Sequence, residues 1–401
     1  MNQHLIFMKN FTKYCSTRYS FRFIFLQFLF AIIYVQPCLA HEQTPIVVNG
    51  PHIKGLYVAD PENYMVFHYE VNAAGELINQ PPQAVSCPHA TNLCSDSSHN
   101  YIYVTCGYGI QNSPYQVAVT AFPLMSDGRI GPKRVAALDT SQSGNGMLAR
   151  NLVYNSLYIV ETTNKVFFRK PPRFKILIHS LKFQSGGRLR TIGALSFVCS
   201  DFGPLVFNNS GHYAYLPADG KVLCFRISSS KVLTLLSPAM AHNTKTLNTT
   251  ALIANRTKPY VYSVVGRSIE VRHIETNGQL APASEITGPV LHLDNRLPYD
   301  NQLFIDPGGH FLYEIGPFGP LLGFKISSDG TIDTTPFLAS TLISSDGNTE
   351  IQFHPLLHIA YVSNGNTLQA YHIQTNGKFV PNLSPPIIAP SGSLFQNILV
   401  L

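Results

Sequence analysis

Polar and ionisable side chains recur where short apolar runs begin, and several could assist the attack of water on a carbonyl group. Glu350, His89 and His354 are candidate general bases, and Arg150 is a candidate partner for developing negative charge. Hydrolysis of an ester needs a base that activates water and donors that hold the oxyanion. Amide side chains at comparable positions are candidate ligand-binding residues: Asn92, Asn151, Asn301, Gln302 and Asn397.

Each of these residues also has a purely structural interpretation. Asn side chains often fold back on the main chain at turns and strand ends. Glu350 and Arg150 could instead form an ion pair, and His89 and His354 each stand beside a proline, a pattern typical of surface turns. The chemistry therefore depends on elements that bring the candidates together.

A repeat of 46 to 57 residues supplies such elements. Each copy contains an apolar run with a central tyrosine, at Tyr57, Tyr103, Tyr158, Tyr215, Tyr262, Tyr313 and Tyr361. A second apolar run follows and ends in a glycine turn in five copies, at Gly75, Gly128, Gly278, Gly330 and Gly377. The third copy is stretched before Gly187, and the fourth has Lys231 in place of glycine. Asp-Gly and Asn-Gly turns between apolar runs indicate β-hairpins.

The repeat predicts an all-β fold, a single seven-bladed β-propeller whose blades each contain four antiparallel strands. A lone blade leaves both faces exposed, whereas a ring of blades buries them and hides most strand edges. We expect the C-terminal run from Leu394 to complete the first blade and close the ring. The segment PIVVN from Pro45 is the alternative closing strand.

The N-terminus has the three parts of a secretory signal peptide. A basic leader precedes the apolar run Phe23–Val35, and the small-residue site Cys38-Leu39-Ala40 follows it. We expect residues 1–40 to be the signal peptide, cleaved after Ala40, and residues 41–401 to form the propeller. Thirteen apolar residues are short for a membrane span, which needs about 20. We therefore expect a secreted or periplasmic protein without a stable membrane span.

Charge and motifs exclude several classes of function. Without the four basic residues of the leader, 24 basic side chains face 22 acidic ones, and no basic run follows, so we expect no nucleic-acid partner. HExxH, GxSxG and CxxCH motifs are missing, and we expect no metal and no cofactor. Beyond residue 40 the cysteines are Cys87, Cys94, Cys106, Cys199 and Cys224, whose pairing their spacing leaves open.

Two strand pairs carry a resemblance to a known family: FIDPGGHFLYEI with LLGFKISSDGTI, and FHPLLHIAYVSNG with LQAYHIQTNGKF. They resemble the seven-bladed propeller lactonases with YVTN-like repeats, typified by the bacterial propeller-type 6-phosphogluconolactonase. The resemblance implies lactone hydrolysis at the mouth of a central channel, where the inner strands begin. An Arg-His pair often stands there in the family; Arg150 matches the arginine, and Asn151 replaces the histidine.

Two functions are consistent with this sequence. The first is hydrolysis of a lactone or related ester at the channel mouth by an exported monomer. The alternative is a non-catalytic propeller that binds a protein, glycan or small ligand through its rim loops.

Overall fold

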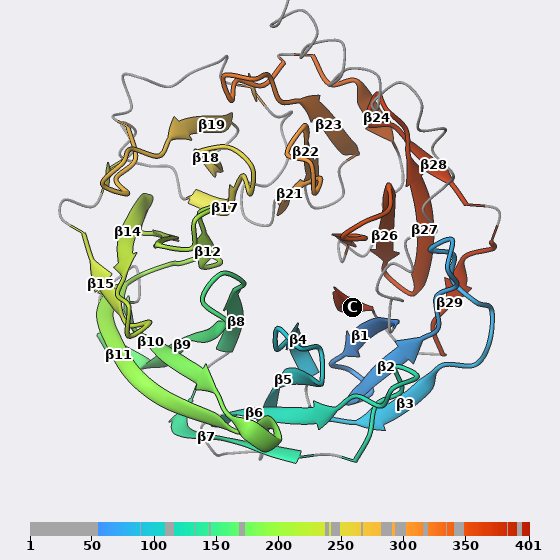
Figure 1. Cartoon of the computed structure of the whole chain (residues 1–401). Helices are drawn as coiled ribbons and strands as arrows, with labels where there is room; N and C mark the ends of the chain where they lie inside the picture. Colours follow the sequence, from blue (N-terminus) through green and yellow to red (C-terminus); the bar gives the residue numbers. More distant parts are fainter. Residues whose placement is uncertain are drawn as a thin grey trace, which may run out of the picture. The chain divides into compact units, whose positions relative to one another are not determined.

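The computed structural model of the chain describes 55–88, 90–108, 116–132, 134–143, 146–167, 173–236, 240–241, 249–265, 268–281, 291–292, 302–315, 320–333, 335–340, 349–382, 384–390 and 395–401. The strands in these ranges all belong to the unit Ile53–Leu401 and form seven antiparallel sheets around a central axis (Figure 1). The predicted seven-bladed β-propeller is therefore confirmed. Signal peptide residues 1–40 and the alternative closing segment at Pro45 lie outside the described residues.

Blades 1 to 4 follow one another along the chain, and the strands of each blade are numbered outward from the axis except for the closing strand. From the inside outward, blade 1 has β30 (Gln396–Val400), β1 (Leu56–Asp60), β2 (Met65–Tyr69) and β3 (Gln83–Ser86). Blade 2 has β4 (Ala90–Ser95), β5 (Tyr101–Tyr108), β6 (Gln116–Pro123) and β7 (Arg134–Ser143). Blade 3 has β8 (Gly146–Asn151), β9 (Ser156–Phe167), β10 (Arg173–Phe183) and β11 (Leu189–Cys199). Blade 4 has β12 (Val206–Phe207), β13 (Tyr213–Ala218), β14 (Lys221–Ile227) and β15 (Leu233–Leu235), and β16 (Met240–Ala241) also pairs with β14.

Blades 5 to 7 repeat the same order. Blade 5 has β17 (Thr249–Ala254), β18 (Tyr260–Val265), β19 (Ser268–His273) and β20 (Leu291–His292). Blade 6 has β21 (Gln302–Ile305), β22 (Phe311–Ile315), β23 (Leu321–Lys325) and β24 (Leu338–Ser340). Blade 7 has β25 (Thr349–Phe353), β26 (Ile359–Asn364), β27 (Thr367–Ile373) and β28 (Phe379–Pro381), and β29 (Ile387–Ile388) also pairs with β27.

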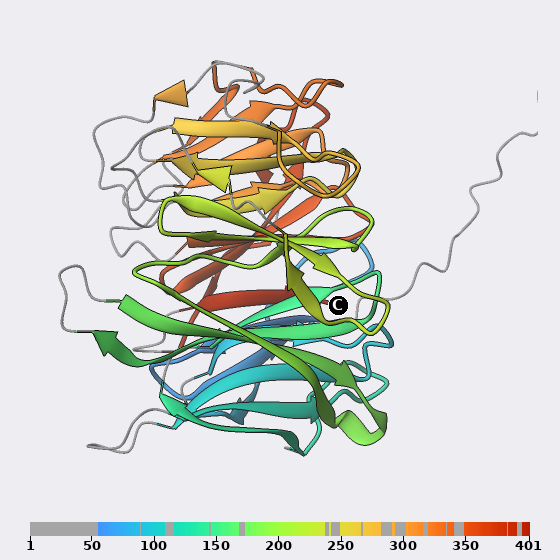
Figure 2. The ribbon, with the colours of Figure 1, turned by 90° about the vertical axis from the view of Figure 1, so that its left-hand side faces the viewer.

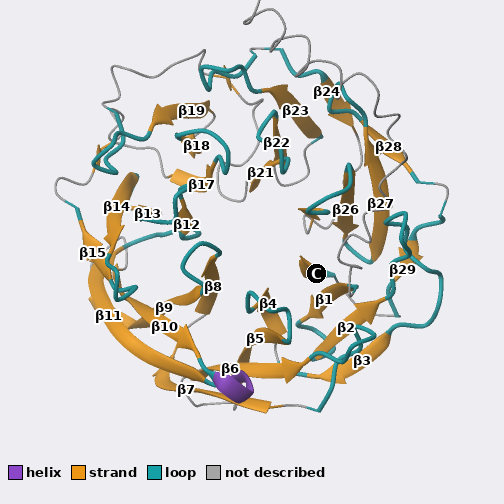
Figure 3. Cartoon of the chain, in the orientation of Figure 1, coloured by secondary structure: helices purple, strands orange, loops and turns teal. Residues whose placement is uncertain are grey.

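Strands account for the regular structure almost entirely. Among the described residues the one helical element is a 3-10 turn, η1 (Ser185–Gly187), between the long strands β10 and β11 (Figure 3). Figure 2 shows these two strands in green on the side of the ring that faces the viewer. In the part of the chain described, no helix is long and apolar enough to cross a membrane.

The repeated tyrosine and the repeated turn contact each other across blade boundaries. Each tyrosine lies fully buried in the second strand of its blade. Among the described residues, six tyrosine hydroxyls donate to the carbonyl of a positive-φ turn residue in the next blade; for example, Tyr313 donates to Gly377 at 2.9 Å and Tyr361 to Gly75 at 2.9 Å. Tyr158 donates to Lys231 at 2.8 Å, and Lys231 adopts φ 69°. Lys231, which stands where other copies have glycine, therefore keeps both the positive-φ turn and the hydrogen bond from the tyrosine.

The C-terminal strand closes the ring, as expected from the sequence. β30 pairs antiparallel with β1, with Leu399 opposite Tyr57 and Ile398 opposite Val58. The backbone of Leu401 also exchanges two hydrogen bonds of 3.2 Å with Gly55. Blade 1 thus takes its innermost strand from residues 396–400 and its other three strands from residues 56–86.

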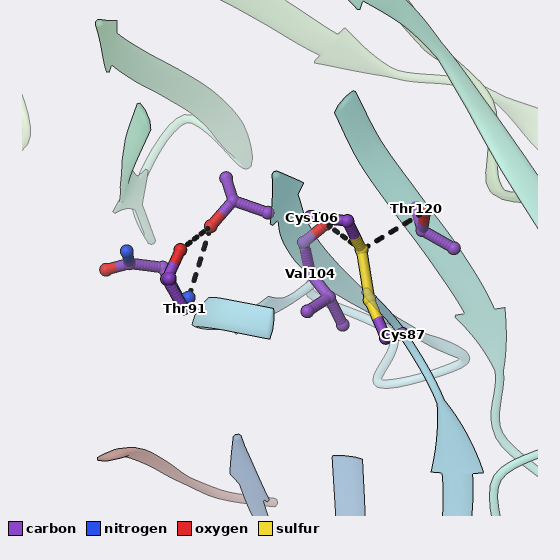
Figure 4. The surroundings of a disulfide bond; sticks show 7 residues. Cys87, Thr91, Val104, Cys106 and Thr120 are labelled. Carbon is purple, nitrogen blue, oxygen red and sulfur yellow. Dashed lines mark hydrogen bonds between the residues drawn. A yellow bond between two sulfur atoms is a disulfide. The ribbon is translucent and has the colours of Figure 1, made fainter. Parts of the chain in front are cut away.

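Within the part of the chain that the structure describes, one disulfide joins β5 to the segment before β4. Cys87 is bonded to Cys106, 19 residues further along (Figure 4). Cys94, Cys199 and Cys224 are free and buried. The nearest pair in sequence, Cys87 and Cys94, is therefore not the bonded one.

Candidate functional site

The seven innermost strands surround the axis, and their two ends define two edges of the ring (Figure 1). We call the residues where these strands begin the start rim, which includes Asn92, Glu350 and Asn397. The residues where they end, and the turns that follow, form the end rim. A five-residue strand is about 17 Å long, so side chains at the two rims do not meet.

Glu350 lies at the start rim, on β25 of blade 7, and reaches the closing strand of blade 1. Its carboxyl group accepts hydrogen bonds from the backbone amides of Asn397 and Ile398 and from Nε2 of Gln352, the last at 3.1 Å. The residue as a whole is partly exposed, yet protein surrounds its carboxyl group. Burial outweighs the three hydrogen bonds and raises the pKa of Glu350 to about 7.

Asn397 occupies a β-bulge that explains why two backbone amides face one carboxylate. The pairing of β30 with β1 shifts register between Val58 and Ala59, which leaves Asn397 without a partner on β1. Its φ of 51° is the left-handed conformation that asparagine tolerates better than most residues. Successive amides in such a conformation form a concave anion-binding arrangement. The bulge therefore turns two backbone N–H groups of the closing strand towards the carboxyl group of Glu350.

The same asparagine continues the network into blade 2. Its Oδ1 accepts the backbone N–H of Leu93 at 2.8 Å, and its Nδ2 lies 3.4 Å from Oδ1 of Asn92. The backbone N–H of Asn92 donates to the Thr105 hydroxyl at 3.1 Å. Glu350, Asn397 and Asn92 thus form one polar group across blades 7, 1 and 2.

Arg150 and Asn151 do not join this group, which corrects the prediction that they begin an inner strand. They are the last two residues of β8 and pair with Leu157 and Ser156 at the beginning of β9. Asn151 is fully buried; its Oδ1 accepts the N–H of Tyr154 and its Nδ2 donates to the carbonyl of Gly211 at 2.7 Å. Both residues therefore belong to the end rim.

His354 also lies at the end rim, directly after β25. It is buried, and its Nδ1 accepts the backbone N–H groups of Leu356 at 3.0 Å and Leu357 at 2.9 Å. Burial lowers the pKa of His354, which favours the neutral ring that these two bonds need. His354 therefore lies in a turn, as the structural interpretation expected, but it is buried and not at the surface.

In the described structure, Gln302 is exposed at the first position of β21 and makes no hydrogen bond to this network. The other two candidates, His89 and Asn301, lie outside the described residues.

Sequence reasoning missed a buried pair in blade 3. Glu161 on β9 is 1% exposed, and its Oε1 lies 2.9 Å from Nε2 of His179 on β10. Oε2 of Glu161 and Nδ1 of His179 are buried without a hydrogen-bond partner in the described structure. Neither residue was among the candidates from the sequence; the available signal was a glutamate that continues the buried run LYIV. No group of three or more His, Cys, Asp or Glu side chains suited to a metal ion occurs among the described residues.

Comparison with known proteins identifies the fold and no sequence family. No protein-family model matches the chain, and no curated protein matches it. Among solved structures, the periplasmic gluconolactonase of Pseudomonas aeruginosa is similar with a TM-score of 0.62 and 15% identity, over 86% of this chain and 98% of that one. A Bacteroides uniformis protein, provisionally assigned as a 6-phosphogluconolactonase, has a TM-score of 0.65 and 12% identity, over 86% and 99%. A Lactobacillus plantarum protein has a TM-score of 0.64 and 13% identity, over 87% and 99%. The chain therefore shares its seven-bladed propeller fold with gluconolactonase structures.

Proposed function

We propose that the protein is an exported monomeric hydrolase of a lactone or related ester, which acts at the start rim with Glu350 as general base. The observation that supports this most is the enclosed carboxyl group of Glu350, whose pKa of about 7 suits proton transfer near neutral pH. The periplasmic gluconolactonase with the same fold supports both the reaction class and export through residues 1–40.

The proposed reaction uses the remaining hydrogen-bonding capacity of Glu350. A carboxylate offers about four acceptor positions, and protein donors occupy three, which leaves one for a water molecule. Glu350 takes a proton from this water while the water oxygen attacks the ester carbonyl. The ring C–O bond then breaks, the alkoxide takes up the proton, and a hydroxy acid results.

The neighbouring amides are the proposed donors to the oxyanion. The bond from Nδ2 of Asn397 to Asn92 is long at 3.4 Å, so a substrate oxygen can replace it at little cost. Asn301, Gln302 and His89 remain candidate contacts by their sequence positions at the beginning of inner strands. Arg150, Asn151 and His354 are not part of this proposal because they belong to the opposite rim.

The test is hydrolysis of a small lactone panel, including glucono-δ-lactone and acyl-homoserine lactones, by the chain from His41 onward. We expect Glu350→Gln to lower kcat at least about 100-fold, the effect of losing a general base, in a protein that remains folded at the assay temperature. Glu62→Gln, at an exposed glutamate of blade 1, is the matched control and should keep full activity. Full activity in Glu350→Gln would exclude Glu350 as the base.

A binding propeller without catalysis is the second candidate function. It is favoured by the hydrogen bonds that link Glu350, Asn397 and Asn92 across three blades, because such bonds also serve to hold adjacent blades together. In that case no lactone is hydrolysed, and Glu350→Gln changes stability alone.

A further inference from the structure

The beginning of β4 lies at the start rim and departs from a regular strand. The pairing of β4 with β5 shifts register between Ala90 and Asn92, which leaves Thr91 without a partner on β5. Such a β-bulge bends its strand and is often found next to active sites, where it turns a side chain into a new direction. The bulge therefore sets the position from which Asn92 faces the closing strand.

The side chain of Thr105 on β5 holds this bulge. Its hydroxyl accepts the backbone N–H of Asn92 at 3.1 Å and lies 3.0 Å from the hydroxyl of Thr91. Thr105 is buried, so water does not compete for these bonds. The hydroxyl thus supplies the acceptor that the regular backbone ladder would otherwise provide at this position.

The disulfide of Cys87 and Cys106 fastens the same place from the next residue of β5 (Figure 4). Cys106 follows Thr105 directly, so the two attachments lie on opposite faces of blade 2. Both cysteines are fully buried, and the backbone N–H of Cys87 donates to the carbonyl of Tyr64 in blade 1 at 2.8 Å. The chain that leads into β4 is therefore tied both to β5 and to blade 1.

Directly after the bulge, β4 contacts the residues of the proposed site. The backbone N–H of Leu93 donates to Oδ1 of Asn397 at 2.8 Å, which fixes the side-chain amide of Asn397. Nδ2 of that amide, the proposed donor to the oxyanion, lies 3.4 Å from Oδ1 of Asn92. Glu350 stands on blade 7 and is bound by backbone amides of the closing strand. A shift of β4 would therefore move the oxyanion donor while the general base stays in place.

We propose that the Cys87–Cys106 disulfide is a positioning element of the proposed active site, which holds the bulged start of β4 so that Asn397 faces the oxyanion. The inference rests on the proposed function, because it assigns a part in that reaction. The two cysteines act through Leu93 and Asn397, not by contact with the substrate. A misplacement of about 1 Å can lower a catalysed rate about 100-fold, so a link outside the reacting groups can control the reaction.

The test measures lactone hydrolysis by the double variant Cys87→Ala and Cys106→Ala, at a temperature where circular dichroism shows it folded. We expect kcat to fall at least about tenfold and KM to stay unchanged, because donors to the oxyanion act in the transition state. Cys224→Ala is the control, since it removes a fully buried thiol of blade 4 and no disulfide. It should keep the native kcat and KM. A disulfide that only stabilises the fold would leave both constants unchanged in the folded double variant.

Hydrogen exchange measured by mass spectrometry gives a readout that needs no activity. We expect peptides from residues 90–95 to exchange faster in the double variant than in the native protein, because the N–H of Leu93 no longer keeps its bond to Asn397. Peptides from residues 260–265 of β18 in blade 5 should exchange as in the native protein, which separates a local shift from a general loss of stability. Native exchange in residues 90–95 would overturn the proposal.

A second variant tests the positioning of β4 if the double variant does not fold. Thr105→Val keeps the disulfide and removes the hydroxyl that binds the N–H of Asn92. Thr120→Val is its control, because Thr120 is equally buried at 1% and its hydroxyl lies 3.4 Å from Sγ of Cys106 on β5, not on β4. We expect Thr105→Val alone to lower kcat with KM unchanged. Native kcat in Thr105→Val would show that the bulge does not control the rate, and would overturn the proposal.

Failure of this proposal can be distinguished from failure of the proposed function. If the native protein hydrolyses no lactone, the proposed function fails, and the exchange of residues 90–95 still decides whether the disulfide holds β4 against Asn397. If the native protein hydrolyses a lactone and the double variant does so with the native kcat, the positioning role is overturned and the proposed function stands.

Discussion

At the scale of single residues, two features of Glu350 act in opposite directions on its pKa. Three hydrogen bonds favour its charged form, whereas burial of the carboxyl group favours the neutral form. Burial dominates, so the group titrates near pH 7 instead of at its ordinary value of 4.5. Such a group changes its charge within the pH range in which most exported proteins work.

This raised pKa makes the stability of the protein depend on pH. Below pH 4.5 Glu350 is neutral in both the folded and the unfolded chain, and its stabilising contribution is complete. As pH rises from 4.5 to about 7 the unfolded chain ionises first, so the free energy of unfolding falls, by roughly 3 kcal/mol at 1.36 kcal/mol per pKa unit. Urea unfolding at several pH values should show this loss in the native protein.

Glu350→Gln is the comparison that isolates this effect, because every other titrating group is kept. The difference in unfolding free energy between the native protein and Glu350→Gln should change across pH 4.5 to 7 and stay constant above. Glu62→Gln should follow the native curve. Parallel curves for the native protein and Glu350→Gln would show that this carboxyl has an ordinary pKa.

Residue positions were predictable from sequence where the repeat was regular. Asn92, Glu350 and Asn397 lie near the beginning of inner strands, in agreement with their positions where apolar runs of the sequence begin. Arg150 and Asn151 were misplaced because the apolar stretch from Leu152 resembles a strand. In the structure it is a turn, with Leu152 and Val153 exposed and Asn155 at φ 44°. The contact between Glu350 and the backbone of Asn397 could not be predicted, because it depends on a bulge.

At the scale of elements, the tyrosine in the second strand and the positive-φ turn of the next blade form a repeated link. Tyr57 donates to Gly128 at 2.6 Å, Tyr215 to Gly278 at 3.1 Å and Tyr262 to Gly330 at 3.0 Å. Both partners were visible as sequence repeats, but their contact was not, since they are 63 to 71 residues apart in these pairs. The repeat therefore predicted the blades, and the fold shows how adjacent blades are joined.

Removing one such link should destabilise the ring measurably. Tyr313→Phe deletes the buried hydroxyl that donates to Gly377 and leaves that carbonyl without its partner. We expect a loss of about 1 to 3 kcal/mol in the free energy of unfolding, measured by urea denaturation. Tyr101→Phe, at a partly buried tyrosine of β5, is the control and should change stability by less than about 0.5 kcal/mol. Equal effects of the two substitutions would contradict the importance of the link.

At the scale of the whole molecule, the ring depends on its last six residues. β30 is the innermost strand of blade 1 and also carries the amides that bind Glu350. The sequence predicted this closure because LFQNILVL follows the last blade where a next inner strand should begin. Closure therefore completes both the fold and the start rim.

Deletion of residues 396–401 should open the ring. The edge of β1 and the apolar faces around Ile398 would become exposed, so we expect a lower melting temperature and a broader thermal transition. A synthetic peptide with the sequence of residues 394–401, added in excess, should restore the native melting curve in part. An unchanged melting curve after the deletion would contradict the role of β30 in closure.

The most direct test of the proposed function is the pH dependence of kcat/KM for lactone hydrolysis by the chain from His41 onward, corrected for spontaneous hydrolysis. We predict that kcat/KM rises with a midpoint near pH 7 as Glu350 loses its proton, and that this rise disappears in Glu350→Gln. A rate that does not change between pH 5 and 9, or the same profile in Glu350→Gln, would contradict the assignment of Glu350 as the general base.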